Sequence, residues 1–377
     1  MRIAILYASA GHGHQKAAEA VREGFLACGV PKEEILVLDA LGETPAWFRT
    51  LYTSIYYYSV KHTPWAWGWT YDFYDRPLIY ERLAQPVRRW GNAWVGKRLV
   101  ERIRQEKPEA ILFTHFFAPE LLGGEKARGA LKALTVTVVT DFLPHSFWIN
   151  PGTDHYWVMS EEGKKILEER GIPSDKITSG GIPISLKFKP EGRKIQLRQK
   201  ERLEENRFTL LITSGSFGLG PTEELLRHLR EFGDRIQVIV VCGRNETLRQ
   251  RLEKQGYPFR LRLYGFVDNM NELMEASDLL IAKPGGATTT ESLAKEIPMV
   301  IMDPIPGQEA GNTKLLQENN ASFLLGQPSD IRVILKAILD YPEVLEEKKR
   351  SIRRLAKPEA AVSLARLVLE TLGTRGR

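Results

Sequence analysis

Two histidines alternate with two glycines in the segment SAGHGHQKAAEA, residues 9–20, which follows an apolar run at the start of the chain. Histidine titrates near neutral pH, so His12 and His14 are candidates for taking up or delivering a proton. The glycines also fit part of a dinucleotide-binding turn, and Asp39 follows at roughly the spacing that such a turn requires. The third glycine of that turn is missing, because Lys16 stands in its place. The segment therefore leaves open an acid–base histidine, a helix cap, a cofactor turn and a metal site.

A zinc site would need several histidines from the first half of the chain. No H-E-x-x-H pattern and no cysteine partner supports such a site. We therefore expect neither a metal ion nor a resident cofactor. The histidines considered as ligands are His12, His14, His115 and His145.

The second half holds the segment AKPGGATTTESLAKEIPMVIMDPIPGQEAGN, residues 282–312. It predicts a strand, a turn over two glycines, and a helix that begins near Thr289. Exposed backbone N–H groups and the dipole at such a helix N-terminus favour a phosphate or pyrophosphate. Glu291 is suited to accept hydrogen bonds from ribose hydroxyls. Thr288 and Glu291 also have the spacing of a capping box, which needs no ligand.

Three further stretches follow predicted strands. The polar group in GQEAGN suits sugar hydroxyls, and its alternative is a solvated loop with a helix cap. The glycine-rich turn at residues 214–220 is suited to lie under the same phosphates. FVDNM, residues 266–270, suits an apolar wall around a base, and its alternative is a core strand followed by a cap. The residues concerned are Gln308, Glu309, Asn312, Gly215, Ser216, Phe266 and Val267.

Apolar strand segments alternate with amphipathic helical segments along both halves of the chain, which predicts an α/β protein with parallel sheets covered on both faces. The segment IPISLKFKP, residues 182–190, contains two prolines and is interpreted as a hinge. We predict domains over residues 1–185 and 186–355, and a terminal segment, 356–377, whose helix is a candidate to pack back on the first domain. Ligands of such sheets bind at the carboxyl ends of the strands.

The composition is ordinary for a globular protein, with 43% hydrophobic and 27% charged residues in a chain of 377. No apolar run approaches the length of a transmembrane helix, and no signal-peptide pattern opens the chain. Cys28 and Cys242 match no metal spacing and predict reduced thiols in a cytosolic protein. The net charge of +6 is compatible with an anionic partner and selects none.

Residues 45–98 interrupt the alternation and are rich in aromatic and basic side chains. They hold six of the eight tryptophans and seven of the twelve tyrosines, with eight Lys or Arg against three Asp or Glu. Trp and Tyr favour the membrane interface and basic residues favour anionic headgroups, so we predict a docking surface. The alternatives are core packing and base stacking on nucleic acid, for which no motif is present. The predicted lipid-facing residues are Trp47, Phe48, Tyr56, Tyr57, Tyr58, Trp65, Trp67 and Trp69, with Arg88, Arg89, Lys97 and Arg98.

Six motifs follow one another along nearly the whole chain: SAGHGHQKAAEA (9–20), TH (114–115), VVTDFLPHSFW (138–148), GIPI (181–184), KPGGATTTES (283–292) and PGQEAGN (306–312). Together they resemble glycosyltransferase family 28, and within it the monogalactosyldiacylglycerol synthases and processive diacylglycerol glucosyltransferases. The resemblance implies a GT-B fold, with two Rossmann-like domains facing across a cleft. It also implies a UDP-sugar donor in the C-terminal half and a lipid acceptor in the N-terminal half.

The resemblance assigns roles to residues of the motifs. His14 is implied as the catalytic base or as the residue that orients the acceptor, with Asp141 or His115 as a supporting or competing candidate. Donor contacts are implied for the glycine turn, for the polar group near residue 308 and for the segment after a strand at 266. The implied donor residues are Gly285, Gly286, Thr288, Glu291, Gln308, Glu309, Asn312, Phe266 and Val267, with Gly215 and Ser216 in the looser turn.

The expected activity is an inverting transfer of a hexose from UDP-glucose or UDP-galactose to diacylglycerol. We expect the protein to be peripheral at the cytoplasmic face of an anionic membrane, without nucleic acid and without an inferred protein partner. The alternatives are a UDP-N-acetylglucosamine-dependent transferase acting on another lipid-linked acceptor, a non-catalytic UDP-sugar sensor and a nicotinamide-dependent oxidoreductase. The residues assigned to the acceptor or the membrane are His12, Trp47, Phe48, Tyr57, Trp65, Trp67 and His145.

Overall fold

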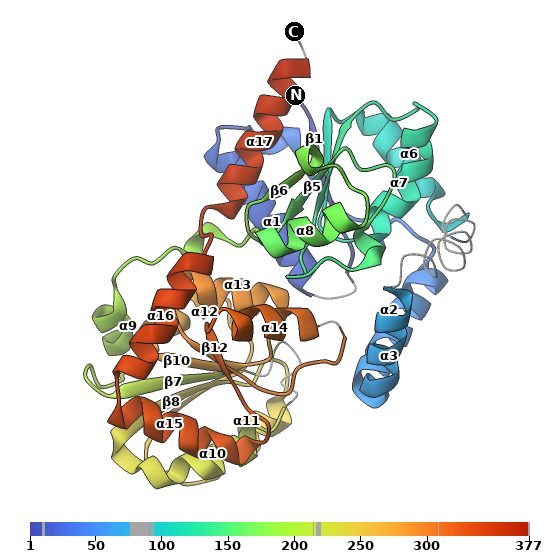
Figure 1. Ribbon diagram of the computed structural model, residues 1–377. Helices are drawn as coiled ribbons and strands as arrows, with labels where there is room; N and C mark the ends of the chain where they lie inside the picture. The colour runs from blue at the N-terminus through green and yellow to red at the C-terminus, as the bar shows by residue number, and fades with distance from the viewer. Residues whose placement is uncertain are drawn as a thin grey trace. The chain divides into compact units, whose positions relative to one another are not determined.

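The computed structural model describes residues 1–9, 12–75, 91, 94–213, 215, 220–307 and 309–375. The chain divides into two compact units. The first unit comprises Met1–Leu186, Ile305–Gly311 and Lys357–Arg377, and the second comprises Lys187–Pro304 and Asn312–Ala356. The unit boundaries near residues 186 and 356 lie one residue from the predicted ones, and residues 305–311 group with the first unit. Each unit is built on a six-stranded parallel sheet, so the predicted α/β class is confirmed (Figure 1).

The sheet of the first unit has the strand order β2-β1-β3-β4-β5-β6. Strand β1, next to the edge strand β2, pairs in parallel with β2 and with β3, so that Ile5 lies beside Val37 on one side and Leu112 on the other. These strands are continuous apolar runs because helices cover both faces of the sheet. The strands are β1 (Ile3–Tyr7), β2 (Ile35–Asp39), β3 (Ala110–Phe113), β4 (Leu134–Val138), β5 (His155–Val158) and β6 (Ile177–Ser179).

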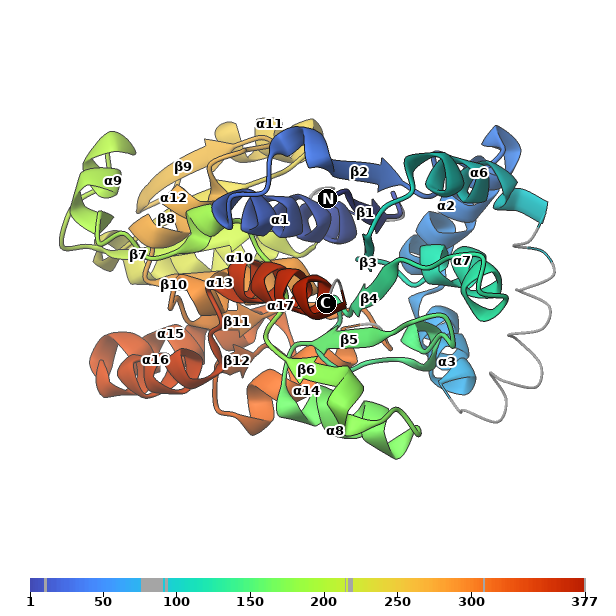
Figure 2. The ribbon, with the colours of Figure 1, turned by 90° about the horizontal axis from the view of Figure 1, so that it is seen from above.

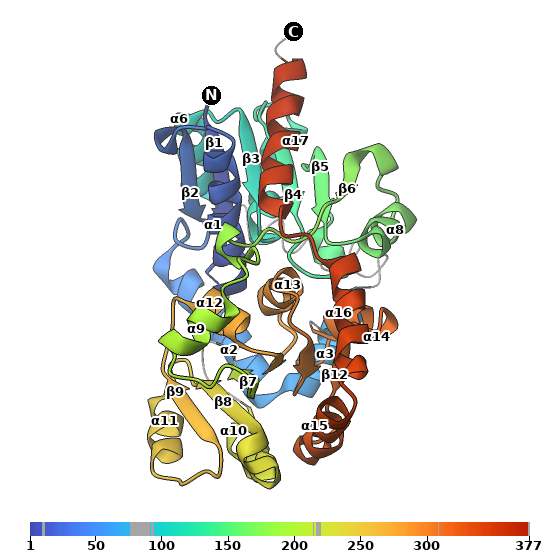
Figure 3. The ribbon, with the colours of Figure 1, turned by 90° about the vertical axis from the view of Figure 1, so that its left-hand side faces the viewer.

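One face of this sheet is covered by two helices from opposite ends of the chain, α1 (His12–Ala27) and α17 (Ala360–Arg375). They lie side by side in two views of the molecule (Figures 2 and 3). Their backbones approach so closely that a Cβ atom at Gly24 would lie 2.2 Å from the carbonyl oxygen of Ala361. Only glycine, which has no Cβ, fits at this position. The terminal helix expected from the sequence is therefore a core element of the first unit.

The opposite face of the first sheet packs on α6 (Lys97–Glu106) and α7 (Phe117–Ala127). Helix α8 (Glu161–Glu169) lies against β5 and β6. The aromatic segment forms two further helices, α2 (Ala46–His62) and α3 (Pro64–Tyr74), which pack against each other. Helix α2 is joined to the core through Phe48 and Tyr52, whose rings contact Phe117.

The sheet of the second unit has the strand order β12-β11-β10-β7-β8-β9. Helices α10, α11 and α15 cover one face, while α12 and α13 lie on the other (Figure 1). The strands are β7 (Phe208–Thr213), β8 (Ile236–Val241), β9 (Arg260–Tyr264), β10 (Leu279–Ala282), β11 (Met299–Ile301) and β12 (Ser322–Leu324). The helices are α9 (Lys194–Lys200), α10 (Thr222–Leu229), α11 (Glu246–Glu253), α12 (Met270–Ala276), α13 (Gly286–Ala294), α14 (Ala310–Glu318), α15 (Ile331–Asp340) and α16 (Glu343–Leu355).

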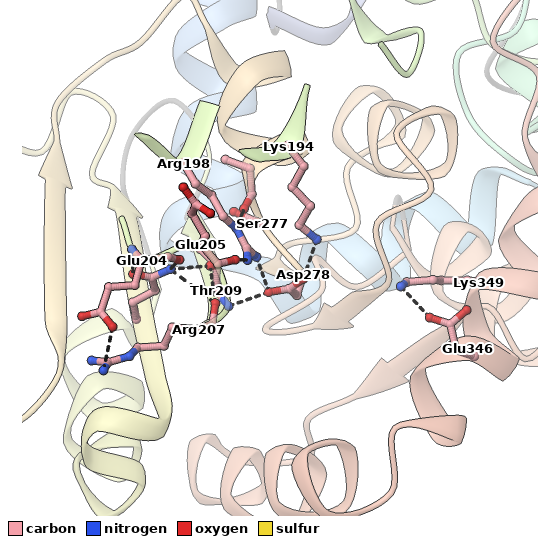
Figure 4. Close-up of polar contacts among 12 residues, drawn as sticks. Lys194, Arg198, Glu204, Glu205, Arg207, Thr209, Ser277, Asp278, Glu346 and Lys349 are labelled. Atoms are coloured by element: carbon pink, nitrogen blue, oxygen red, sulfur yellow. Dashed lines mark hydrogen bonds and ion pairs between the residues drawn. The ribbon is translucent and has the colours of Figure 1, made fainter. Parts of the chain in front are cut away.

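A polar cluster around Asp278 ties α9 to the amino-terminal end of this sheet (Figure 4). The Asp278 carboxylate accepts hydrogen bonds from the Arg198 guanidinium at 2.6 Å and from the backbone N–H of Thr209 at 2.7 Å. The Arg198 Nε–H also donates to the carbonyl oxygen of Ala276 at 2.9 Å. Charge-assisted hydrogen bonds of this kind stabilise the buried guanidinium through groups of the protein itself, so no bound ligand is needed to explain it. The cluster lies at the end of the sheet opposite the carboxyl ends, where ligands of such sheets bind.

Candidate active site

Each sheet has one point where the strand order reverses, and ligands of doubly wound sheets bind at the carboxyl ends of the strands there. In the first unit this point lies between β1 and β3, and in the second it lies between β7 and β10. His14 follows β1 and His115 follows β3, while Gly285 follows β10. His14, His115 and Gly285 therefore lie at the two positions where the fold itself favours ligands.

His14 is held by the end of β3 through two hydrogen bonds. Its Nδ1 atom lies 2.9 Å from the carbonyl oxygen of Thr114, and the Thr114 hydroxyl donates to the carbonyl oxygen of His14 at 2.9 Å. The Thr140 hydroxyl also lies 2.9 Å from Nδ1. A carbonyl oxygen only accepts hydrogen bonds, so the ring proton must be on Nδ1. The lone pair of Nε2 is then available to accept a proton.

The surroundings of His14 keep its ring neutral. Burial lowers the pKa of His14 to about 4, against the opposing effect of the hydrogen bond to the Thr114 carbonyl. The ring also lies in the first turn of α1, where the positive end of the helix dipole disfavours an imidazolium. At neutral pH the imidazole is therefore ready to act as a base without first losing a proton.

Asp141 and His115 come together with His14 near the buried ring of Trp148. The Trp148 indole N–H donates to Asp141 at 2.8 Å, and the Trp148 ring centroid lies 6.3 Å from that of His14. Burial raises the pKa of Asp141 to about 6, while the hydrogen bond from Trp148 acts in the opposite direction. The His115 ring packs edge-on against His14 with centroids 4.5 Å apart, and its Nδ1 accepts from the N–H of Phe117 at 3.0 Å. All three candidate catalytic residues thus belong to one cluster.

Thr114, Thr140 and Trp148 were not singled out as site residues from their sequence positions. Each occurs in a quoted motif, directly beside His115, Asp141 or Phe147. Their roles depend on hydrogen bonds and ring contacts between segments up to 126 positions apart. For Thr114 and Thr140, the signal in the sequence is a polar residue at the end of a predicted strand, next to a candidate catalytic residue.

His145 and His12 differ in burial and in the element to which they belong. His145 is buried and caps the short turn Ser146–Trp148, because its Nδ1 accepts from the N–H of Phe147 at 3.0 Å. His12 is the first residue of α1 and is half-buried. The structure therefore gives His145 a turn-stabilising contact, and the predicted contacts of both histidines with an acceptor stay predictions.

In the second unit the glycine turn opens α13 earlier than expected. The helix begins at Gly286 with Gly285 as its N-cap, so the predicted start near Thr289 is wrong. The capping-box alternative for Thr288 and Glu291 is also wrong, because the cap position carries no side chain. Glycine is a poor helix former, which is why the sequence pattern placed the start one turn later. The first backbone N–H groups of α13 have no acceptor within the helix and point to its amino end.

Asn312 and Thr290 hold this turn in place. The Asn312 amide donates to the carbonyl oxygen of Pro284 at 2.7 Å, and the Thr290 hydroxyl donates to that of Gly286 at 2.8 Å. Asn312 and Glu291 are both buried. The amino end of α13 is thus held in a fixed conformation, and its dipole and N–H groups favour negative charge.

The three residues predicted to contact the sugar do not all belong to the same unit. Asn312 lies in the second unit, whereas Glu309 lies in the segment Ile305–Gly311 of the first unit. The Glu309 carboxylate accepts from the N–H of Ile305 at 2.8 Å, so it stabilises its own loop. That loop packs on the first unit, because a Cβ at Gly68 of α3 would lie 2.8 Å from Pro306. Gln308 lies outside the described residues.

An exposed aromatic ring follows the carboxyl end of β9. Phe266 is 59% exposed, and the guanidinium of Arg244 lies 5.8 Å from its ring centroid. Three strand spacings separate β9 from β10, a distance of about 14 Å along the edge of the sheet. A planar base at Phe266 and a diphosphate at α13 would fit this span. Val267 is half-buried beside the ring, Gly215 has a positive φ of 69°, and Ser216 lies outside the described residues.

Within the ranges that the structure describes, no three His, Cys, Asp or Glu side chains form a group that could hold a metal ion. In the same ranges no helix is both long enough and apolar enough to cross a membrane.

Helices α2 and α3 carry an exposed apolar surface. Four exposed side chains, Trp47, Leu51, Ile55 and Tyr58, recur at helical spacing along one face of α2. Trp65 and Trp69 are exposed on α3. We call these six side chains the aromatic stripe.

Other residues assigned to the membrane lie elsewhere. Phe48 lies outside the aromatic stripe, and its ring is stacked on Phe117 at a centroid distance of 5.9 Å. The Lys97 ammonium lies 5.4 Å from the ring of exposed Trp94. The residues whose side chains or positions are outside the described part of the chain are Tyr56, Tyr57, Trp67, Arg88 and Arg89.

The two units have the architecture of a GT-B protein, and solved structures of similar fold cover nearly the whole chain. Acinetobacter baumannii MurG has a TM-score of 0.61 at 13% identity and covers 98% of this chain and 100% of that one. Anabaena HepE in complex with UDP-glucose has a TM-score of 0.57 at 15% identity, with coverages of 99% and 100%. At these identities the likeness concerns the fold alone.

Sequence comparison identifies the family. Residues 14–184 match the family described as monogalactosyldiacylglycerol (MGDG) synthase, and residues 209–363 match the glycosyltransferase family 28 C-terminal domain. The chain therefore belongs to glycosyltransferase family 28, with an N-terminal half of the monogalactosyldiacylglycerol synthase type. It is 29% identical over 376 residues to a processive diacylglycerol beta-glucosyltransferase of Bacillus thuringiensis (strain Al Hakam), covering 98% of this chain and 93% of that protein.

Proposed function

We propose that this protein transfers a hexose from UDP-glucose or UDP-galactose to the hydroxyl of diacylglycerol, with inversion at the anomeric carbon, at the surface of a membrane. The observation that carries the proposal is the neutral His14, whose Nδ1 proton is directed to the Thr114 carbonyl while Nε2 keeps its lone pair. The family and the name of the Bacillus relative support this substrate class.

In the proposed reaction, Nε2 of His14 takes the proton of the acceptor hydroxyl as its oxygen attacks the anomeric carbon of the sugar. The bond from that carbon to the diphosphate breaks, and its electron pair leaves with UDP. The backbone N–H groups at the start of α13 stabilise the charge that develops on the leaving diphosphate. The imidazolium on His14 then returns its proton to solvent. Phe266 supports the uracil, because its exposed ring offers an apolar face.

The activity is tested by incubating the full chain with diacylglycerol vesicles and each UDP-sugar, followed by mass analysis of lipids and measurement of released UDP. Monohexosyldiacylglycerol formed with one UDP released per hexose is expected. Binding of UDP-sugar without any lipid product would instead indicate a sensor. Transfer of N-acetylglucosamine alone, to another lipid-linked acceptor, would replace diacylglycerol as the substrate.

Phe266→Ala is expected to weaken the binding of UDP roughly tenfold, because base stacking on an aromatic ring contributes about 1–3 kcal/mol. The exposed position of Phe266 keeps the substitution from disturbing the core. Titration calorimetry with UDP measures the effect. Tyr341→Ala removes another exposed ring of the second unit and serves as the control. Equal affinities of the wild-type protein and the Phe266 variant would show that the base binds elsewhere.

The aromatic stripe is proposed as the surface that meets a bilayer containing anionic lipid. Its tryptophans have the chemistry of the membrane interface. The triple substitution Trp47→Ala, Trp65→Ala, Trp69→Ala is expected to lower the partition onto phosphatidylcholine–phosphatidylglycerol vesicles by at least tenfold, as measured by co-sedimentation. The pair Val333→Ala, Tyr341→Ala removes exposed apolar side chains from the second unit as a control. Binding that depends neither on the stripe nor on the anionic lipid content would refute the docking proposal.

A further inference from the structure

Asp75, a residue that no motif includes, directly follows α3 and forms hydrogen bonds with the loop that carries Asp141 and Trp148, beside a ring contact between Tyr74 and Phe147. This carboxylate accepts two parallel bonds from the Arg170 guanidinium, each 2.9 Å long. Its Oδ1 atom also accepts from the backbone N–H of Ser146 at 2.7 Å. The carbonyl oxygen of Asp75 accepts from the Ser146 hydroxyl at 2.7 Å.

These contacts converge on the turn Ser146–Trp148. Ser146 is bound to Asp75 through both its N–H and its hydroxyl, and that hydroxyl lies 3.2 Å from Nη1 of Arg170. The third residue of the turn, Trp148, donates its indole N–H to Asp141. The chain of contacts from Asp75 to Asp141 therefore runs through a single short turn.

The burial of the partners makes the contact specific. Arg170 is 15% exposed at its side chain and Asp75 is 34% exposed, so the pair is partly shielded from water and arranged bidentately. Bidentate arginine–carboxylate pairs combine strength with a defined geometry, unlike most exposed ion pairs. The Nε2 atom of His145, the other residue of this loop with a titratable side chain, lies 3.7 Å from Asp75.

We propose that Asp75 is a positioning residue for the glycosyl transfer, which holds the Ser146–Trp148 turn so that Trp148 and Asp141 keep their places beside His14. The inference rests on the proposed function in one respect, namely that the cluster around His14 performs the transfer. Because Asp75 ends the helix pair that carries the aromatic stripe, it also links the proposed docking surface to the catalytic loop.

Asp75→Asn tests this role, because it preserves the shape of the side chain and removes its charge and one acceptor. We expect kcat to fall about 10- to 100-fold, since a displacement of about 1 Å in a reacting group has an effect of that size. The KM for the UDP-sugar is expected to stay within about twofold, because the donor residues at α13 lie in the second unit. Hydrogen exchange of peptides covering residues 141–148 is expected to become faster.

Asp154→Asn is the matched control. Like Asp75, the Asp154 carboxylate accepts hydrogen bonds from a cationic side chain and from a backbone N–H. Its donors are the Lys126 ammonium at 2.6 Å and the N–H of Thr135 at 3.0 Å. These contacts lie at the amino-terminal end of the sheet, away from the candidate active site. Its kcat should remain near that of the wild-type protein. Equal losses of kcat in both variants would mean general destabilisation and overturn the proposal.

Two results separate this inference from the proposed function. Unchanged hydrogen exchange at residues 141–148 in Asp75→Asn overturns the contact network, whatever substrate the enzyme uses. Faster exchange with an unchanged kcat overturns the positioning role. If the wild-type chain transferred no hexose to diacylglycerol, the proposed function would fail, while the exchange measurement would still decide whether Asp75 holds the loop.

Discussion

Replacing His14 by alanine is expected to lower kcat by about 10²- to 10⁴-fold, the usual contribution of a positioned general base. The variant loses Nε2, the only atom of this side chain that can accept the hydroxyl proton once Nδ1 has donated to Thr114. The affinity for UDP is expected to remain within about twofold, because Phe266 and the amino end of α13, the proposed contacts of the uracil and the diphosphate, belong to the second unit. Initial rates with saturating donor, together with UDP titration, measure both quantities.

The control for this substitution is His228→Ala, which removes a histidine from α10 of the second unit. Thermal melting should show that both variants fold, since half-buried His14 forms two hydrogen bonds whose loss is worth about 1 kcal/mol each. A folded His14 variant with near-normal turnover would remove His14 from the mechanism.

The pH dependence of kcat is expected to show an acid limb with a midpoint near pH 6. Burial raises the pKa of Asp141 to about 6, so this carboxyl loses its charge as the pH falls through that value. His14 stays neutral down to its own pKa of about 4 and so does not titrate in this range. The limb follows if the Asp141 carboxylate stabilises the imidazolium that forms on His14 during transfer.

Asp141→Asn distinguishes the two residues. The amide keeps an acceptor for the Trp148 indole but has no charge, so the plateau of kcat should fall about tenfold or more. The acid limb should move from about 6 to about 4, where His14 becomes protonated. The titratable side chains around this loop, His115, His145 and Asp75 with Arg170, are unchanged in the variant. An acid limb that stays near pH 6 would exclude Asp141 as the titrating group. Complete loss of activity in Asp141→Asn, with only a mild effect in His14→Ala, would make Asp141 the base.

Much of the fold and part of the site could be predicted from local patterns. The apolar strands and the amphipathic helices recur with their own periods, and the positions after strand ends in a parallel sheet are where ligands bind. His14 is a candidate from its position after the first predicted strand, whereas the catalytic roles of His115 and Asp141 are implied by the resemblance to the family. The glycine turn at residue 285 is predicted as an anion site because it precedes a helix N-terminus, although that helix begins at Gly286 rather than near Thr289.

The direction in which a side chain points and the identity of its hydrogen-bond partners are not local properties of the sequence, so they could not be predicted. Trp47 and Phe48 are neighbours of the same chemical type, yet Trp47 is 64% exposed and Phe48 stacks on Phe117. The difference arises because adjacent residues of a helix point about 100° apart, so only the position of α7 decides which one is covered. The assignment of Glu309 to the sugar stays a prediction, and no local pattern indicated that its carboxylate accepts from the N–H of Ile305 in a loop that groups with the first unit.

The sequence by itself determined which residue types follow which strands, and hence the class of the protein and the residues available for catalysis. The tertiary structure alone decided their chemical state. The proton of His14 is on Nδ1 because the carbonyl of Thr114, 100 positions away, accepts it. The pKa values of His14 and Asp141 are shifted in opposite directions because burial disfavours the charged form of each, cationic in one and anionic in the other. Burial and hydrogen-bond partners come from segments distant in sequence, so no local pattern specifies them.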